Sequence, residues 1–316
     1  MNLGVVVLNW NGGEVTPRCL DSLLASVCPA ERIVVVDNAS TDGSADLIRG
    51  RYPQVVLIEN DSNLGFAEGN NVGIRYLLER GFDLVMLLNN DAVVDAQCLC
   101  KLRLAAERES AAAYGATIYE LAAPEKVWYA GGTINRLTLD ARHDLALHSA
   151  DAKPRPTGFI TGCCLMLRAD ALQRLGLLDK DFFAYYEDVD WCLRARAAAE
   201  VLLYVPDAVV LHEGSHSFRR SDPRQRSQPT FTWMQSPPLV LYLAYRNRLL
   251  LVRKHVRGQL HLAFLVVRRL ARGALHGALL ISFGRWRQAR ATIDGTLDGL
   301  LRPPRPLRAA RYVTSA

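Results

Sequence analysis

Residues 83–95 read DLVMLLNNDAVVD, and this stretch decides how the chain is interpreted. The apolar run 84–88 predicts a strand buried on both faces. The strand ends abruptly in the polar residues 89–91, of which Asp91 carries a charge, and Asp95 is placed to cap a following helix. Open α/β sheets bind ligands at the carboxyl ends of their strands. A plain strand-to-helix turn explains the same residues equally well, because Asn and Asp are common in turns.

Two earlier strands end in polar residues in the same way. Residues 3–10 form an apolar strand that runs into an Asn-Gly-Gly turn, and residues 32–36 form a second strand that runs into DNASTDG at 37–43. A third strand is predicted at 55–59, and helical patterns follow each strand. This alternation over the first hundred residues predicts a doubly wound parallel sheet. The loop after the first strand lacks GxGxxG, so the dinucleotide fingerprint is absent.

The second half of the chain gives weaker signals. Residues 112–157 show little pattern, and 140–157 read as a surface loop. A strand is predicted at 159–168, followed by a short helix capped by Asp170 and ended by Gly176. After a helix predicted at 192–199, two strands are predicted at 201–205 and 209–212. The last of these strands ends at His212.

Composition sets broad limits on what the protein can be. The chain has 316 residues, half of them apolar, which is enough for one large domain or two modest ones. Met1 leads straight into an apolar strand, and no apolar run reaches the ~20 residues of a membrane span. The seven cysteines include no CxxC pair, and neighbours such as Cys98 and Cys100 are too close to suggest a disulfide framework. We therefore expect reduced cysteines and a cytoplasmic protein.

The charge is distributed unevenly along the chain. Residues 239–316 contain 15 Arg or Lys and two acids, while the preceding part contains 23 basic and 30 acidic residues. The tail reads as helices whose apolar runs of about ten residues are broken by Arg, which suits helices lying in a membrane interface. We predict a catalytic domain at 1–217, a mobile linker at 218–238, a basic amphipathic helical region at 239–301 and a disordered tail at 302–316.

Several acids and one histidine are candidates for chemistry. Asp37, at a strand end, could accept the imide N–H of a uracil or thymine base, although a turn or helix-cap role is equally consistent. Asp91 could bind a divalent cation, and His212 is the candidate for a second ligand, with His216 as its competitor. A solvent-exposed polar residue is the more common role of a lone histidine.

Three acids, Glu187, Asp188 and Asp190, gather where a helix is predicted to begin. The helix dipole favours acids there, which is a sufficient structural explanation. The aromatic pairs of 182–186 directly before them suggest instead an active-site wall of low dielectric constant. In such surroundings one carboxylate can act as a general base toward an acceptor hydroxyl.

Seven stretches together resemble glycosyltransferase family 2 with a GT-A fold, and most closely its bacterial rhamnosyltransferase-like branch. They occur in the family's order and span residues 3 to about 217. The stretches are VVVLNWNG (5–12), VVVDNASTDGS (34–44), NLGFAEGNNVGI (63–74), LLNNDAVV (87–94), TGCCLMLR (161–168), FFAYYEDVDWCLRAR (182–196) and the histidine of VLHEGSHS (210–217).

The resemblance implies a role for each matching position. Asp188 would be the general base, assisted by Glu187, and Asp91 and His212 would bind Mn²⁺ or Mg²⁺. Residues 89–91 would be a variant of the DxD motif, with Asn89 where many members have Asp. The implied donor-binding residues are Asn9, Asn11, Asp37, Asn38, Asp42, Asn63, Gly65, Asn70, Asn89 and Asn90.

The implied fold is a GT-A doubly wound mixed sheet with a C-terminal helical, membrane-associating extension. The implied enzyme is an inverting, metal-dependent glycosyltransferase that moves a sugar, L-rhamnose from dTDP-rhamnose as the first choice, to a hydroxyl of a cell-surface or lipid-linked glycan. We expect it in the cytoplasm, peripherally bound to the inner face of the membrane through anionic lipid, without nucleic acid, and as a possible homo-oligomer.

Two other classes of protein fit the sequence less well. A nucleotidyltransferase that makes sugar nucleotides would carry a Gly-rich loop with Arg or Lys after the first strand, where residues 9–18 offer only Arg18. A non-catalytic carbohydrate- or membrane-binding scaffold would have lost the acids at 91 and 188, and both are present.

Overall fold

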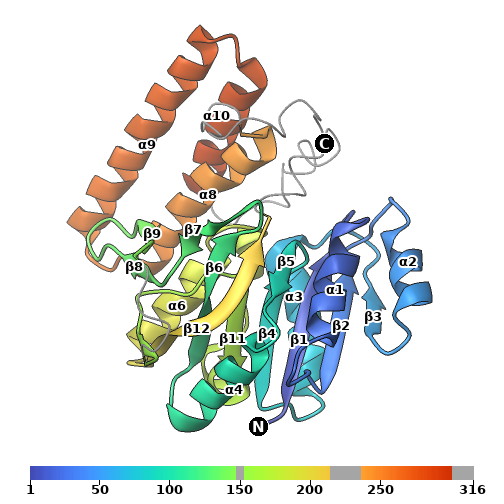
Figure 1. The fold of residues 1–316 in the computed structure, drawn as a ribbon. Coiled ribbons are helices and arrows are strands. Elements are labelled where there is room, and N and C mark those ends of the chain that lie inside the picture. Colours follow the sequence, from blue (N-terminus) through green and yellow to red (C-terminus); the bar gives the residue numbers. More distant parts are fainter. Residues whose placement is uncertain (147–152, 214–235, 301–316) are drawn as a thin grey trace. The chain divides into compact units, whose positions relative to one another are not determined.

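The computed structural model describes residues 1–146, 153–213 and 236–300, and it contains two compact units (Figure 1). The first unit comprises Met1–Asn135, Asp140–Lys180 and Glu187–Ser217. The second comprises Arg136–Leu139, Asp181–Tyr186 and the part of the chain from Phe218 onward. Each unit is described separately.

A 10-stranded mixed sheet forms the centre of the first unit. Its main order is β10-β12-β6-β11-β4-β1-β2-β3, with β5 paired to β12 and β7 paired to β6. The strands are β1 (Leu3–Asn9), β2 (Arg32–Asp37), β3 (Val56–Glu59), β4 (Leu84–Asn89), β5 (Ala92–Val94), β6 (Ala113–Glu120), β7 (Ala123–Tyr129), β10 (Arg155–Pro156), β11 (Cys164–Arg168) and β12 (Leu202–His212). Strands β8 (Gly132–Ile134) and β9 (Ala141–His143) form a separate two-stranded sheet.

Strand direction divides this sheet into two parts. Strands β1 to β4 are parallel to their neighbours within that set, as the strand–helix alternation predicts. Strand β11 runs antiparallel to both β4 and β6, which makes the sheet mixed. The carboxyl ends of β1, β2 and β4 therefore lie at one edge, where residues 9, 37 and 89 end their strands. The predicted α/β mixed sheet is confirmed.

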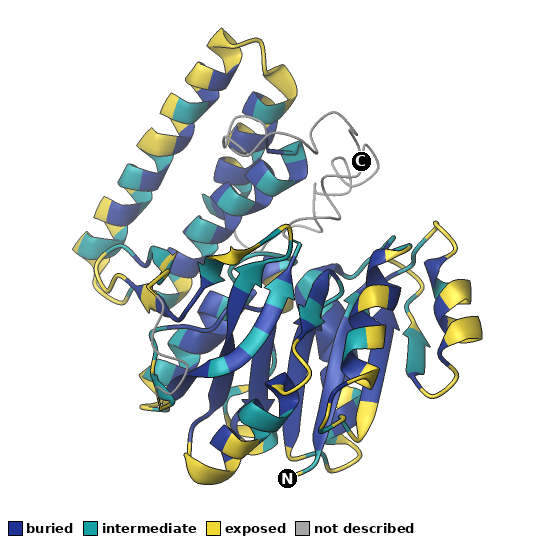
Figure 2. Ribbon diagram, viewed as in Figure 1, coloured by how far each residue is buried: buried dark blue, intermediate teal, exposed yellow. Residues whose placement is uncertain are grey.

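Helices of the first unit cover the sheet, and the central strands are buried (Figure 2). The helices are α1 (Val15–Leu24), α2 (Ser44–Arg51), α3 (Gly65–Leu78), α4 (Cys98–Arg108), α5 (Ala169–Leu175) and α6 (Glu187–Ala197). Close packing of α3 depends on a small residue, because a Cβ atom at Gly73 would lie 2.5 Å from Val6 Cγ1. Strand β1, which contains Val6, therefore fixes the position of α3 and of the loop that precedes α3.

Several boundaries predicted from sequence were wrong. The two strands expected at 201–205 and 209–212 are one strand, β12, whose register shifts between Val205 and Val209 around Pro206, which has no N–H for the ladder. The strand expected at 159–168 begins only at Cys164. Helix α5 begins at Ala169 with Arg168 as its N-cap, so Asp170 lies within the first turn, while Gly176 does end the helix.

The region from 112 to 157 contains more structure than its sequence pattern indicates. It holds β6 and β7 in the main sheet and the β8–β9 pair, and β10 lies within the expected surface loop. Short strands with mixed exposure carry little periodicity of their own, because their neighbours in the sheet decide which face is buried.

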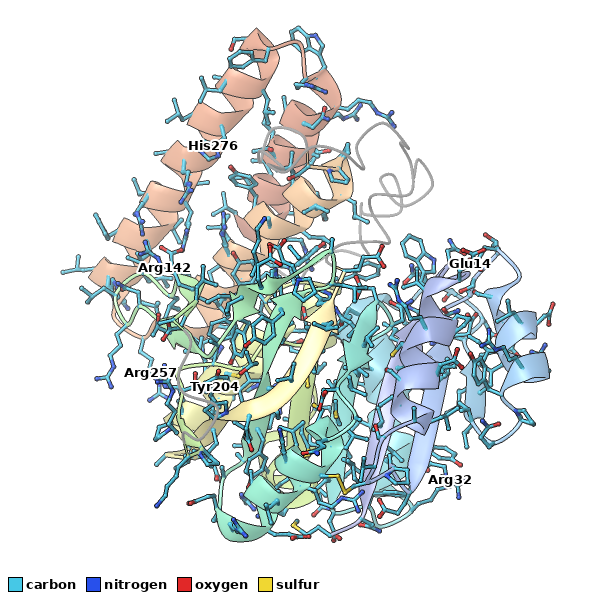
Figure 3. The ribbon with its side chains drawn as sticks, in the orientation of Figure 1. Glu14, Arg32, Arg142, Tyr204, Arg257 and His276 are labelled. Carbon is cyan, nitrogen blue, oxygen red and sulfur yellow. A yellow bond between two sulfur atoms is a disulfide. The ribbon has the colours of Figure 1, made fainter. Side chains whose placement is uncertain are left out.

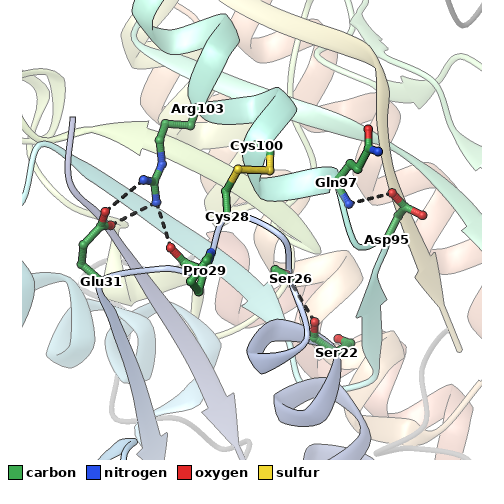
Figure 4. The surroundings of a disulfide bond; sticks show 9 residues. All are labelled: Ser22, Ser26, Cys28, Pro29, Glu31, Asp95, Gln97, Cys100 and Arg103. Carbon is green, nitrogen blue, oxygen red and sulfur yellow. Dashed lines mark hydrogen bonds and ion pairs between the residues drawn. A yellow bond between two sulfur atoms is a disulfide. The ribbon is translucent and has the colours of Figure 1, made fainter.

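The expectation that all cysteines are reduced was also wrong. Cys28, which follows α1, forms a disulfide with Cys100 of α4, 72 residues away (Figure 4). Beside it, Arg103 donates hydrogen bonds to the Glu31 carboxylate and to the Pro29 carbonyl oxygen. The other five cysteines are buried free thiols. Neither the spacing of neighbouring cysteines nor a CxxC motif can reveal a pair that is brought together by packing of α4.

Three helices make up most of the second unit: α8 (Pro238–His255), α9 (Gln259–Ser282) and α10 (Trp286–Leu300). Helices α8 and α10 approach closely at Gly295, which has no side chain. A Cβ atom at this position would lie 2.2 Å from the Tyr242 carbonyl oxygen. Tyr242 also donates a hydrogen bond from its hydroxyl to Asp298 (2.9 Å). None of the helices in the described residues is both long enough and apolar enough to cross a bilayer.

Candidate active site

Asp91 and His212 lie in contact although 121 positions separate them. Asp91 follows β4, and His212 ends β12, which pairs with β5 so that His212 lies opposite Ala92. The Asp91 Oδ1 atom is 3.0 Å from His212 Nε2, and both side chains are buried. The Asn89 amide nitrogen lies 3.3 Å from the same imidazole nitrogen. Antiparallel pairing of β5 with β12 is what brings the two candidate metal ligands together.

The donor atoms of this pair fit a divalent cation. A carboxylate oxygen and an imidazole nitrogen suit Mn²⁺ and are also compatible with Mg²⁺. Residues 1–146, 153–213 and 236–300 contain no group of three or more His, Cys, Asp and Glu side chains that could hold a metal. Two protein ligands would therefore need diphosphate oxygens to complete the coordination.

A chain of hydrogen bonds connects this region to Asp37 at the end of β2. Asn9 donates from its amide nitrogen to Asp37 Oδ1 (2.6 Å), and its Oδ1 accepts from the Thr16 hydroxyl (2.6 Å). Thr16 in turn accepts from the amide of Asn90 (3.0 Å), the residue before Asp91. Asp37 and Asn9 are buried, so three strand ends share one ordered polar network.

The side-chain amides of two other predicted donor-binding residues, Asn38 and Asn70, bond to groups of the protein itself. Asn38 donates to Asn63 Oδ1 (2.8 Å) and to the Gly65 carbonyl oxygen (3.2 Å), which fixes the turn before α3. Asn70 donates to the carbonyl oxygen of Phe66, one helical turn back. These amides have structural partners within the protein.

Two predicted donor-binding residues shape the loops beside β1. Asn11 has a left-handed backbone (φ 50°), and its side-chain oxygen accepts from the Thr41 N–H. Asp42 accepts from the Gly13 N–H (2.9 Å), so the loops after β1 and β2 are joined. Both residues therefore order the edge of the sheet where a nucleotide would bind.

Asp188 lies in the first turn of α6, and backbone groups orient its carboxylate. Its Oδ2 accepts from Gly162 N (2.8 Å) and its Oδ1 from Val189 N (2.7 Å). The carbonyl oxygen of Cys163, the next residue after Gly162, accepts from Asn89 N (2.9 Å). The short segment before β11 thus connects the end of β4 to the start of α6.

Burial changes the acidity of the two candidate catalytic acids. Desolvation, opposed by hydrogen bonds from Gly162 and Val189, raises the pKa of Asp188 above its ordinary value. Burial and the nearby Asp188 carboxylate raise the pKa of Glu187 well above its ordinary value. Within the described part of the chain, Glu187 Oε2 has no hydrogen-bond partner.

The aromatic residues before α6 have packing partners within the second unit. Phe183 and Tyr185 pack against a cluster that contains Leu239, Tyr242 and Ala291. The low-dielectric wall beside the catalytic acids stays a prediction.

Trp128 and His143 are site residues that sequence reasoning missed. The Trp128 ring lies 4.8 Å from the His212 ring and 4.5 Å from the His143 ring, and the Trp128 carbonyl oxygen is 2.9 Å from His143 Nδ1. Burial lowers the pKa of His143. A positive charge on His143 lowers the pKa of Asp188. In the sequence, the aromatic pair at 128–129 near Gly131 was the local feature that could have drawn attention to Trp128. His216, the competing ligand, lies outside the described residues.

Comparison with known proteins agrees with this architecture. The model of the family described as Glycosyl transferase family 2 matches residues 4–176. The chain is 30% identical over 242 residues to an N-acetylglucosaminyl-diphospho-decaprenol L-rhamnosyltransferase of Mycobacterium tuberculosis, covering 69% of this chain and 78% of the relative. It is 24% identical over 181 residues to the dTDP-rhamnosyl transferase RfbF of Shigella flexneri, covering 57% and 59%.

A solved structure extends the similarity of fold to nearly the whole chain. The mannosyltransferase PcManGT of Pyrobaculum calidifontis, in complex with GDP-Man and Mn²⁺, superposes with a TM-score of 0.58 at 16% identity. The match covers 96% of this chain and 88% of that one. This likeness concerns the fold.

Proposed function

The chain belongs to glycosyltransferase family 2 and is a nucleotide-sugar glycosyltransferase with a GT-A fold, and from this premise we propose that it transfers L-rhamnose from dTDP-L-rhamnose. The proposed acceptor is a hydroxyl of a lipid-linked or cell-surface glycan. The observation that carries the proposal is the Asp91–His212 contact of 3.0 Å, connected through Asn90 to the network around Asp37. The two rhamnosyltransferase relatives support the choice of sugar.

The donor would bind along the carboxyl edge of β1, β2 and β4. Asp37 would accept the imide N–H of the thymine base with a lone pair not used by Asn9 or by the Ser40 N–H. Asp91 and His212 would hold Mn²⁺ or Mg²⁺, which when bound neutralises charge on the leaving diphosphate. Asn89 and Asn90 hold the neighbouring side chains in place through His212 and Thr16.

Asp188 would act as the general base of an inverting displacement. It takes the proton of the acceptor hydroxyl, whose oxygen forms a bond to the anomeric carbon as the bond from that carbon to the diphosphate oxygen breaks. Attack comes from the face opposite the leaving group, so the configuration inverts. The hydrogen bonds from Gly162 and Val189 hold the carboxylate in one orientation. Burial and the Asp188 carboxylate raise the pKa of the neighbouring Glu187, which disfavours two adjacent buried negative charges.

A screen of sugar nucleotides tests this proposal. Purified protein is incubated with dTDP-rhamnose, dTDP-glucose, UDP-GlcNAc and GDP-mannose, with Mn²⁺ or with EDTA, and release of nucleoside diphosphate and the melting temperature are measured. We expect metal-dependent responses that are largest for dTDP-rhamnose. A larger response to another sugar nucleotide would replace rhamnose as the donor sugar. If no sugar nucleotide gave a response while nucleoside triphosphate with sugar phosphate was consumed, the chain would be a nucleotidyltransferase.

We further propose that residues 239–301 bind the anionic surface of the cytoplasmic membrane, with residues 1–217 performing catalysis. Helix α9 contains three arginines and no acid. His276, labelled in Figure 3, contacts the Tyr245 hydroxyl of α8 and so marks the inner side of α9. Large apolar side chains are exposed elsewhere on α9 and just after it: Leu260, Phe264, Val267, Leu275, Leu279, Ile281, Phe283 and Trp286.

An exposed apolar face with exposed arginines nearby in the chain fits an anionic lipid surface. Phe264 and Trp286 are 63% and 65% exposed, and Arg272, Arg285 and Arg287 are exposed nearby in the chain. Apolar side chains would enter the boundary between headgroups and acyl chains, while each Arg near the surface contributes about 1 kcal/mol with anionic lipid. The acceptor, if lipid-linked, would be presented at the same surface.

We predict that the double variant Phe264→Asp, Trp286→Ala loses binding to vesicles of phosphatidylglycerol and phosphatidylcholine by about tenfold or more. The change removes two exposed aromatic side chains and adds one negative charge. Co-sedimentation with vesicles measures it, and the wild-type protein should bind less at high salt. Leu47→Asp, an exposed apolar residue on α2, serves as the matched control. Equal binding by wild type and double variant would rule out this face.

A further inference from the structure

The segment Asp181–Tyr186 has an unusual backbone directly before the two candidate catalytic acids. Three of its residues, none of them glycine, have left-handed φ angles: Phe183 (62°), Tyr185 (68°) and Tyr186 (74°). L-residues with large side chains rarely adopt this conformation, and it persists only where the surroundings enforce it. Tyr186 is bonded to Glu187, the first residue of α6. The segment therefore leads directly into α6.

Three consecutive residues of α8, Arg246, Asn247 and Arg248, hold this segment, and we call them the α8 clasp. The Asn247 amide nitrogen donates to the carbonyl oxygens of Phe182, Ala184 and Tyr185, each at 2.8 Å. Arg246 donates to the carbonyl oxygen of Asp181 (2.6 Å) and to Asn247 Oδ1 (2.8 Å). Arg248 donates to the Tyr186 hydroxyl and lies over its ring.

Burial makes the α8 clasp specific for this one backbone conformation. Arg246 is 2% exposed and Asn247 is fully buried. A buried amide is stable only when hydrogen-bonded, and Asn247 Nδ2 donates to carbonyl oxygens of the segment. If the segment relaxed to ordinary φ angles, the Asn247 amide would lose these three contacts. Packing of α8 against α10 through Gly295 and Gly299 keeps the helix in place.

We propose that Arg246 and Asn247 are positioning residues that fix the start of α6 and thereby aim the Asp188 carboxylate at the acceptor hydroxyl. The catalytic consequence rests on the proposed function, in which Asp188 is the general base. The structural consequence does not, because it concerns only the order of the first turn of α6. The helical region at the C-terminal end would then serve catalysis as well as membrane binding.

The test compares Asn247→Ala with Arg253→Ala in the full-length protein. Arg253 lies on the same helix and also donates to two carbonyl oxygens, but these belong to Gly299 and Leu300 of α10. Hydrogen–deuterium exchange, read by mass spectrometry, follows the amides of residues 187–191. We expect at least tenfold faster exchange there in Asn247→Ala and wild-type exchange in Arg253→Ala. Arg248→Ala, which removes a half-buried side chain and leaves the amide contacts, should give an intermediate increase.

Kinetics with the donor chosen by the sugar-nucleotide screen give the second measurement. Asn247→Ala should lower kcat by on the order of 100-fold, as expected when a catalytic group is misplaced, with Mn²⁺-dependent dTDP affinity unchanged. Unchanged exchange at 187–191 in Asn247→Ala, or equally fast exchange in Arg253→Ala, would overturn the inference. Faster exchange with a wild-type kcat would show that the α8 clasp orders α6 without serving catalysis. The exchange experiment decides the structural claim even if every sugar nucleotide fails as a donor.

Discussion

Replacing Asp188 with Asn is expected to lower the rate of sugar transfer by roughly 10²- to 10⁴-fold, the usual contribution of a general base. Asn has nearly the same shape, and its one side-chain oxygen can still accept a hydrogen bond from Gly162 N or from Val189 N, although not from both. It cannot take the proton of the acceptor hydroxyl. Donor affinity should stay at the wild-type value, because the proposed contacts with base and diphosphate come from other residues. Single-turnover transfer and calorimetric titration with dTDP measure the two quantities.

The pH dependence of transfer gives an independent check on Asp188. Only the ionised carboxylate accepts a proton, so the rate falls as pH falls through the pKa of Asp188. Burial raises that pKa, so the loss should begin at a higher pH than for an exposed aspartate. The Asn variant should lack this acid limb. Asp190→Asn, two residues further along α6 at a buried ion pair with Arg194, is the matched control and should reduce stability more than turnover. Wild-type rates in Asp188→Asn would exclude Asp188 as the base.

Replacing Asp91 or His212 with Ala is expected to weaken the Mn²⁺-dependent binding of dTDP by at least about 100-fold. Loss of a partner that only supports a metal ligand already costs about 10- to 100-fold in metal affinity, and a direct ligand contributes more. In EDTA the variants and the wild type should bind dTDP equally weakly. Isothermal titration with and without Mn²⁺ separates the two contributions.

Asp95→Ala is the control for the metal experiment. Asp95 lies four residues after Asp91, and its Oδ1 accepts from Gln97 N (2.9 Å) just before α4, so its loss should reduce stability only. A second control is the double variant Asp91→Ala, His212→Ala. If both residues bind the same ion, the double variant should be little worse than either single variant. Additive losses, or equal Mn²⁺ dependence in all variants, would contradict a shared metal site.

The parallel half of the fold could be predicted from sequence because its signals are local. Continuous apolar runs at residues 3–9, 32–36 and 84–88 mark strands buried on both faces, and polar residues mark where they end. Right-handed crossovers then place those ends at one edge of the sheet. Asp37 and Asp91 were identified in this way, and the structure places their neighbours Asn9 and Asn90 in one hydrogen-bond network.

Other features depend on which strands and helices become neighbours, and no local pattern encodes that. The position of His212 beside Asp91 follows from pairing of β12 with β5, and that of Trp128 and His143 follows from strands whose own periodicity is weak. The Cys28–Cys100 disulfide likewise depends on where α4 packs.

The sequence by itself determined the α/β class, the family and the strand ends that carry Asp37 and Asp91, since apolar periodicity and turn residues act over a few positions. The tertiary structure alone decided that Phe183 and Tyr185, within the segment 181–186, pack against Leu239, Tyr242 and Ala291. The left-handed backbone of this segment is stabilised by donors more than 60 residues away, on Arg246 and Asn247. A strained local conformation of this kind depends on distant hydrogen bonds, so the residues that adopt it do not predict it.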